Sequence, residues 1–290
     1  MISSFMSCQL LYAYYMFLYR VVYCILLHRV INSTPSMLEV RNLTKYYKRI
    51  AAVDGISFTI RPGEVLGFLG PNGAGKSTTV KMLIGLIEPT RGEVFFKGKD
   101  VRVDWPGFLR TAGYVPEEPN LYSQLTGREY LQLTGRLRGI PRAALEARMD
   151  RLLRLFSLWE DRHVLLSSYS KGMRQKIMLS AALLHDPELL ILDEPFSGLD
   201  VNTALILRSL IRALSQEGKM IFYSSHVLET VEKVCTSVLI LRKGIAVAYD
   251  QVEHLRDLLR QPSLEAVFTQ LTQQEDPDCV VREIISAIRS

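Results

Sequence analysis

The fold of this chain is decided by one short stretch, Gly70-Pro71-Asn72-Gly73-Ala74-Gly75-Lys76-Ser77-Thr78. It matches the pattern G-x-x-x-x-G-K-[ST], in which glycines let the backbone turn so that successive N–H groups point at phosphate oxygens. Residues 65–69 before it form an apolar run typical of a buried strand, and residues 76–87 after it carry apolar side chains at helical spacing. A strand, a glycine-rich turn and a helix in this order predict a phosphate-binding loop.

The side chains of this loop predict a bound nucleoside triphosphate and a metal ion. Lys76 is expected to reach the β- and γ-phosphates and to act in catalysis, and the Ser77 hydroxyl is expected to ligate Mg²⁺. The alternative, a glycine-rich loop with an incidental lysine, leaves the flanking strand and helix unexplained. The residues expected to bind the nucleotide here are Gly70, Pro71, Asn72, Gly73, Ala74, Gly75, Lys76, Ser77 and Thr78.

A second motif follows the apolar run at residues 189–192, where Asp193 and Glu194 come directly after the expected strand. That strand would deliver Asp193 beside the phosphate loop, where it is expected to hold Mg²⁺ through water. Glu194 is expected to polarise the attacking water as a general base. By itself an apolar run ending in Asp-Glu is common and marks a buried strand meeting solvent. In combination with the phosphate loop, it predicts hydrolysis of a nucleotide phosphate.

The remaining sequence predicts an α/β domain with a helical insertion. Residues 126–183 contain no good strand and show apolar side chains at helical spacing. Residues 202–214 form a helical pattern between two apolar runs, which fits a crossover between parallel strands. The other expected strands cover residues 38–43, 92–96, 113–115, 189–192, 220–223, 238–241 and 245–247.

Composition excludes several classes of protein. The 290 residues are 48% hydrophobic and 22% charged, which excludes a disordered chain. The 35 basic and 30 acidic residues give a net charge of +5, which implies no particular partner. No basic stripe with interleaved aromatic residues is present, so no nucleic-acid partner is expected. The four cysteines have no CxxC spacing and are expected to be reduced thiols; they are Cys8, Cys24, Cys235 and Cys279.

Residues 1–36 differ from the rest of the chain. Residues 5–27 are nearly all apolar, interrupted by Gln9 and Arg20, and are long enough to span a bilayer. A secretory signal does not fit, because the segment lacks a basic start and an A-x-A-like cleavage site. One interpretation is a membrane anchor. The other, which we favour, is that translation starts at Met37, where an ordinary first strand begins.

Three further motifs narrow the class of nucleotide hydrolase. They are Tyr169-Ser170-Lys171-Gly172-Met173-Arg174-Gln175 before an apolar helix, Ser197-Gly198-Leu199-Asp200 after Asp-Glu-Pro-Phe, and Ser224-Ser225-His226 at a strand end. Together with the two motifs above, in this order and spacing, they resemble the nucleotide-binding subunits of ABC transporters. The resemblance covers about residues 38–250.

The resemblance implies roles for residues in these motifs. Ser170 and the backbone at Gly172 would bind the γ-phosphate of an ATP held by the other subunit of a dimer. Asp200 falls in the loop that crosses the dimer interface, and His226 would contact the γ-phosphate as a catalytic residue. Glu117 stands where the family usually has glutamine and would bind the nucleotide and Mg²⁺.

The expected site also includes a tyrosine that would contact adenine and two residues that differ from the family's signature motif. Tyr47 is expected to stack on adenine, with Tyr46 as the second candidate. Lys171 and Met173 replace small or polar residues of the family's signature, and Lys171 adds positive charge at the γ-phosphate position. These substitutions, like Glu117, resemble the exporter subfamily that pairs with ABC-2-type permeases.

The resemblance also implies the fold class and the domain boundaries. The expected fold is α/β, a P-loop NTPase core with a mostly parallel sheet, an N-terminal antiparallel β region and a helical insertion subdomain. We expect an apolar extension at residues 1–36, an ABC ATPase domain at residues 37–250 with its helical subdomain at about residues 120–183, and a helical tail at residues 251–290.

The implied function is hydrolysis of ATP, with Mg²⁺, by one subunit of a membrane exporter. The expected partners are a membrane permease and a second ATPase subunit, identical or related, with the protein peripheral at the cytoplasmic face of the cell membrane. One alternative is a soluble ABC-type ATPase that acts without a permease, although such proteins usually carry two nucleotide domains or long coiled coils. A second alternative, a non-hydrolysing subunit, conflicts with the intact Lys76, Asp193, Glu194 and His226.

Overall fold

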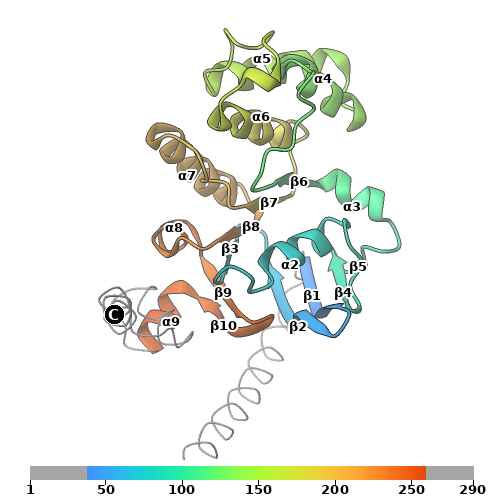
Figure 1. Ribbon diagram of the computed structural model, residues 1–290, viewed down its shortest axis with the longest axis vertical. Coiled ribbons are helices and arrows are strands. Elements are labelled where there is room, and N and C mark those ends of the chain that lie inside the picture. The colour runs from blue at the N-terminus through green and yellow to red at the C-terminus, as the bar shows by residue number, and fades with distance from the viewer. Residues whose placement is uncertain (1–37, 259–290) are drawn as a thin grey trace, which may run out of the picture. The chain divides into compact units, whose positions relative to one another are not determined.

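The computed structural model describes residues 38–258. The interpretations of residues 1–36 and of the tail beyond residue 258 therefore lie outside the described residues. Within the described range, no helix is both long enough and apolar enough to cross a membrane. Two β-sheets and the helices around them make up this part of the chain (Figure 1).

The first sheet is antiparallel and four-stranded. Its order is β2 (Ile50–Ile60), β1 (Leu38–Tyr47), β4 (Arg91–Phe96) and β5 (Lys99–Asp100). β1 pairs with β2 and with β4, and the β1–β2 register is interrupted at three places. The sequence predicts only the first part of β1, and it predicts neither β2 nor β5.

The second sheet has six strands and positions the candidate site. Its order is β10 (Ile245–Gln251), β9 (Ser237–Arg242), β3 (Val65–Leu69), β8 (Met220–Ser225), β7 (Leu189–Asp193) and β6 (Ala112–Val115). All neighbours in it are parallel except β9 and β10. The carboxyl ends of β3, β7 and β8 therefore meet at one edge, where ligands bind in open α/β sheets. This arrangement confirms the predicted α/β fold.

The second sheet is buried on both faces. In β3, Val65 and Leu69 belong to one hydrophobic cluster, and Leu66 and Phe68 belong to the other. Side chains alternate between the faces of a strand, so a strand covered on both sides becomes a continuous apolar run. This explains why the short runs at residues 65–69 and 189–192 predicted strands correctly.

Most of the helices connect one strand to the next along the chain. They are α2 (Lys76–Leu83), α3 (Trp105–Thr111), α4 (Gly127–Leu137), α5 (Arg142–Leu155), the 3₁₀ turn η1 (Leu166–Ser168), α6 (Lys171–Leu183), α7 (Val201–Gln216), α8 (Leu228–Val234) and α9 (Val252–Leu258). Between β6 and β7, α4, α5 and α6 form a group of their own, separated from the antiparallel sheet by the six-stranded sheet (Figure 1).

Helix α2 ends earlier than the predicted residue 87. Gly85 has a left-handed φ of 73°, and its N–H donates to the Met82 carbonyl. The Leu86 N–H donates to the Lys81 carbonyl at 2.9 Å. These two hydrogen bonds form a Schellman motif, which terminates a helix even where apolar residues continue beyond it.

Candidate functional site

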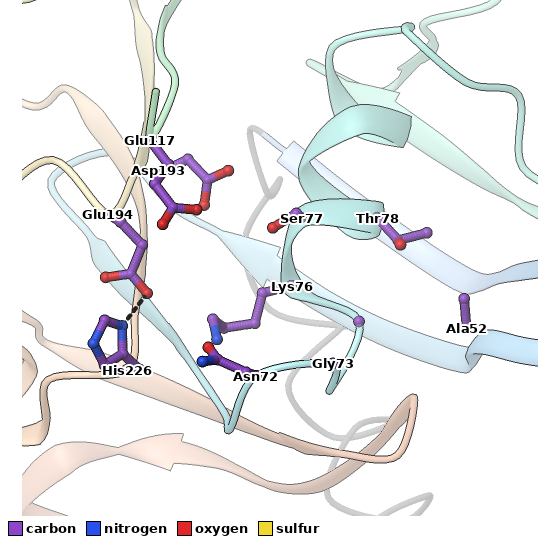
Figure 2. A pocket seen from close by; sticks show the side chains of 11 residues that line it. Ala52, Asn72, Gly73, Lys76, Ser77, Thr78, Glu117, Asp193, Glu194 and His226 are labelled. Carbon is purple, nitrogen blue, oxygen red and sulfur yellow. Dashed lines mark hydrogen bonds and ion pairs between the residues drawn. The ribbon is translucent and has the colours of Figure 1, made fainter. Parts of the chain in front are cut away.

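A pocket lies at the edge where β3, β7 and β8 end (Figure 2). It collects residues from four motifs that are far apart in the sequence. Its lining consists of Ala52, Asn72, Gly73, Gly75, Lys76, Ser77, Thr78, Glu117, Asp193, Glu194 and His226. The structure therefore brings together most of the predicted phosphate-loop residues and three of the predicted carboxylates, those of Glu117, Asp193 and Glu194.

The phosphate loop requires glycine for conformational and for spatial reasons. Gly73 and Gly75 have left-handed φ values of 78° and 110°. A Cβ atom on Gly75 would also lie 2.5 Å from the carbonyl oxygen of Ala52, closer than real side chains approach. Gly75 is the N-cap of α2 and makes no side-chain cap hydrogen bond, so the first N–H groups of the helix are available to an anion.

Lys76 is buried at the base of this loop. Its ammonium donates hydrogen bonds to the carbonyl oxygens of Gly70 at 2.7 Å and Pro71 at 3.3 Å. Burial lowers the pKa of Lys76, and the carboxylates that face it, Glu194 foremost, oppose that shift. The loop thus holds one positive charge opposite a group of negative charges. Of the other predicted loop residues, Ala74 is buried and does not line the pocket.

Asp193 is buried at the end of β7, and the Ser224 hydroxyl donates a hydrogen bond to it. Burial raises the pKa of Asp193, and the nearby carboxylates of Glu117 and Glu194 add to that rise, whereas the Ser224 hydrogen bond opposes it. The negative charge at this position is therefore costly until a cation neutralises it.

The donors on this side of the pocket fit Mg²⁺. Ser77 offers a hydroxyl oxygen, and Asp193 and Glu117 offer carboxylate oxygens, which are the hard ligands that Mg²⁺ prefers. Within residues 38–258, no group of three or more His, Cys, Asp and Glu side chains could hold a metal ion by itself. An ion here would therefore need oxygens from a bound phosphate, as is usual for Mg²⁺ in nucleotide sites.

Glu194 has an unusual backbone and two side-chain partners. Its φ is 47°, in the left-handed region that residues other than glycine rarely adopt. One carboxylate oxygen lies 2.7 Å from His226 Nδ1, and the other accepts a hydrogen bond from the Ser225 hydroxyl at 3.3 Å. Figure 2 shows the His226 contact beside Lys76.

Three predicted residues belong to a second group that does not line the pocket. Ser170 is the N-cap of α6, and its hydroxyl accepts from the Met173 N–H at 3.2 Å. A Cβ on Gly172 would lie 3.2 Å from the carbonyl oxygen of Gly198. Asp200 is the N-cap of α7, and its hydrogen bonds from Thr203 lower the pKa of the Asp200 carboxyl to about 2. These residues have local structural roles that the sequence motifs did not predict.

Lys171 links the two loops of this second group. Its ammonium donates to the Ser197 hydroxyl at 3.0 Å. A Cβ on Gly198 would lie 2.8 Å from Lys171 Cδ, so the aliphatic part of the lysine covers this glycine. The substitution that departs from the family signature therefore connects α6 with the loop before α7.

The adenine contact stays a prediction. Tyr47 and Tyr46 are exposed at the end of β1, and neither lines the pocket. The ammonium of Lys45 lies 5.6 Å from the centre of the Tyr47 ring. Ala52, on the neighbouring strand β2, lines the pocket instead, and no sequence motif indicated it.

Sequence analysis also assigned no role to the two serines before His226. Ser224 contacts Asp193 and Ser225 contacts Glu194, so three consecutive residues at the end of β8 hold the two carboxylates that follow β7. The only available signal was the position of the serine pair directly before the histidine.

The chain is similar in sequence to known ABC transporter proteins. The family model described as "ABC transporter" matches residues 53–197. The curated "ABC-type transporter ATP-binding protein EcsA" of Bacillus subtilis (strain 168) is 35% identical over 242 residues, which are 83% of this chain and 98% of that protein.

Solved structures agree in fold. The chain titled "Structure of ATP binding subunit of ABC transporter" has a TM-score of 0.77 and 36% identity, over 81% of this chain and 99% of that one. The cbiO1 protein of Clostridium perfringens, described as part of the ABC transporter complex cbiONQ, has a TM-score of 0.66 and 25% identity, over 79% and 97% of the two chains.

Proposed function

Because this chain belongs to the ABC transporter ATP-binding family, we propose that it is the ATP-hydrolysing subunit of an exporter and drives a separate membrane permease. ATP binding and hydrolysis are the activities of the family. One observation carries the assignment of residues, namely that Lys76, Asp193, Glu194 and His226 converge on one pocket at the end of the parallel strands.

In the proposed mechanism, the phosphate loop and the N-terminus of α2 bind the phosphates of ATP. The ammonium of Lys76 leaves the carbonyl oxygens of Gly70 and Pro71 and donates hydrogen bonds to the β- and γ-phosphate oxygens instead. There it stabilises the negative charge on the phosphoryl group that is transferred to water. Glu194 accepts a proton from the attacking water, and His226 holds Glu194 and contacts the γ-phosphate. Bound Mg²⁺, held by Ser77, Asp193 and Glu117, would neutralise phosphate charge.

The proposed active unit is a head-to-tail dimer, either of this chain or with a related subunit. Ser170, Gly172 and Asp200 do not line the pocket of their own chain, which supports their action on the pocket of a second subunit. ATP would then bind the closed dimer better than the open one, and this difference in affinity would shift the population toward closure. Hydrolysis would remove that difference and let the dimer open.

The proposed partner is a permease, with this protein peripheral at the cytoplasmic face of the cell membrane. The support is the relative cbiO1, which is described as part of a multi-subunit transporter complex. The export direction rests on Glu117, Lys171 and Met173, the departures shared with the subfamily that pairs with ABC-2-type permeases. We further propose that residues 37–250 form the ATPase domain, with α4 to α6 as its permease-facing subdomain and residues 251–290 as a tail.

The variant Glu194→Gln tests the catalytic part of this proposal. Glutamine has nearly the same size but cannot accept the proton, so turnover should fall by at least about a hundredfold while ATP affinity is retained. ATP should also trap the variant as a dimer. Phosphate release, nucleotide binding and size-exclusion chromatography measure these three effects. Substantial residual turnover would exclude Glu194 as the base.

The same variant serves as bait for the partner. Tagged Glu194→Gln protein, purified with ATP from detergent-solubilised membranes of the native host, should retain a polytopic membrane protein that mass spectrometry identifies. Lys76→Ala, which should not close on ATP, is the matched control. Recovery of ribosomal or DNA-associated proteins without any membrane partner would favour the ABC-type ATPase that acts without a permease.

A further inference from the structure

We propose that Ser225 is a positioning residue that fixes the carboxylate of Glu194 for the attacking water. This inference rests on the proposed role of Glu194 as the general base. The Ser225 hydroxyl donates to one carboxylate oxygen of Glu194 at 3.3 Å, while His226 contacts the other at 2.7 Å. Both oxygens of the base are therefore held by neighbouring residues of one strand end.

The pairing of β7 with β8 creates this arrangement. The two strands are parallel, and Asp193 lies opposite Ser224 in their register. The Glu194 N–H donates to the Ser224 carbonyl at 3.1 Å, which extends the pairing by one residue. Ser224 therefore meets Asp193 and Ser225 meets Glu194, so each carboxylate has its own hydroxyl donor.

The direction of the Ser225 proton follows from its other contacts. The Ser225 oxygen accepts a hydrogen bond from the Val227 N–H at 3.0 Å, and a backbone N–H can only donate. The single hydroxyl proton is thus available to an acceptor. Tyr223 also interacts with Ser225, but a carboxylate such as the proposed base Glu194 is a stronger acceptor than a phenol oxygen.

Burial distinguishes Ser225 from the other partner of Glu194. Ser225 is 1% exposed and Glu194 is 8% exposed, whereas the His226 side chain is 59% exposed. His226 is also proposed to contact the γ-phosphate, which would compete with Glu194 for the imidazole. Ser225 has no role toward ATP in the proposed mechanism, so it can hold the base throughout the reaction.

The test compares Ser225→Ala with Ser180→Ala. Loss of one hydrogen bond to a charged group should lower kcat of Ser225→Ala about tenfold, with KM and ATP affinity changed less than about twofold. Ser180 is a matched control, because it is also fully buried and its hydroxyl bonds only a helix carbonyl, that of Lys176. Ser180→Ala should leave kcat unchanged, because the hydroxyl that it removes bonds only within its own helix.

A conservative variant separates positioning from packing. Ser225→Thr keeps the hydroxyl and should recover most of kcat. A Ser225→Ala protein with the kcat of Ser180→Ala overturns the inference, and so does a Ser225→Thr protein that melts like the wild type but is as slow as Ser225→Ala. If threonine disturbs the fold, the alanine comparison decides alone.

The Glu194→Gln variant distinguishes failure of this inference from failure of the proposed function. If Glu194→Gln retains turnover, Glu194 is not the base and the proposed function fails with the inference. If Glu194→Gln abolishes turnover while Ser225→Ala leaves kcat unchanged, only the inference about Ser225 fails.

Discussion

At the scale of single residues, the pocket concentrates negative charge in a buried place. Glu117, Asp193 and Glu194 lie around the same cavity, and two of them are buried. Ionised groups cost free energy when they are removed from water near like charges. Such a site is a stability cost that the protein carries for function, since bound phosphate and cation would supply the missing charge balance.

Asp193→Asn should therefore stabilise the nucleotide-free protein by about 1 kcal/mol while abolishing hydrolysis. Asparagine has the same shape and still accepts the Ser224 hydrogen bond, but it carries no charge. Thermal and denaturant unfolding without nucleotide measure the gain, and phosphate release measures the loss. A variant that is less stable than the wild type at neutral pH would contradict this account of the site.

The pH dependence of this gain has a definite sign. The folded pKa of Asp193 lies above its ordinary value of 3.8, so the folded state binds more protons than the unfolded state between the two pKa values. Stability of the wild type thus falls as pH rises through that interval, and the cost is complete above the folded pKa. The advantage of Asp193→Asn should be largest above the folded pKa and should vanish as pH falls toward about 4.

The sequence predicted which residues line the pocket better than it predicted the residues that hold them in place. Lys76, Asp193 and Glu194 are identifiable because their motifs have fixed local spacing, and the structure brings them together. The contacts of Ser224 and Ser225 depend on which strand lies beside which, and that pairing joins segments about thirty residues apart. Local pattern contains no information on this register.

At the scale of elements, the prediction succeeded for the fully buried strands β3, β7 and β8 and failed for β2 and for two short helices. β2 was missed because residues 50–60 include Asp54 and Gly55, and Gly55 has a φ of 64° within the strand. The irregular pairing with β1 breaks the alternation that identifies a strand. Helices α3 and α8 were missed because each has only seven residues, too few to show helical periodicity.

Helix α6 shows how one residue can serve an element and a site. Ser170 accepts the Met173 N–H and so stabilises the start of the helix. Its proposed second role is to bind the γ-phosphate of another subunit. Replacing Ser170 with a residue that caps the helix but has no hydroxyl separates the capping role from the proposed γ-phosphate contact.

Ser170→Asn and Ser170→Ala should therefore differ in stability but not in activity. Asparagine is as good an N-cap as serine, whereas alanine costs about 1 kcal/mol. Both variants lack the hydroxyl, and both should lose most ATPase activity. Denaturant unfolding and phosphate release provide the comparison. Full activity in Ser170→Asn would mean that Ser170 only caps the helix.

At the scale of the whole molecule, the chain carries two groups of proposed nucleotide-binding residues, and only one of them lines the pocket. One half is the pocket that contains Lys76 and Glu194, and the other is the group that contains Ser170, Gly172 and Asp200. Within the described residues, two contacts join the start of α6 to the loop before α7, where this second group lies. Lys171 donates to Ser197, and Lys176 pairs with Asp200. A head-to-tail pair of chains would join each half to the half that it lacks.

Mixing two inactive variants tests this arrangement directly. Lys76→Ala damages the pocket half, and Ser170→Arg damages the other half, so each protein alone should be inactive. In a mixed dimer both defects fall in one site, and the second site is intact. With free exchange of subunits, half of the dimers are mixed, and about a quarter of the wild-type ATPase activity should return if the sites act independently.

Lys76→Ala mixed with Glu194→Gln is the matched control and should recover nothing, because both defects lie in the same half. Recovery in the first mixture but not in the second requires a site shared between two copies of this chain, whereas no recovery in either mixture would contradict the head-to-tail arrangement.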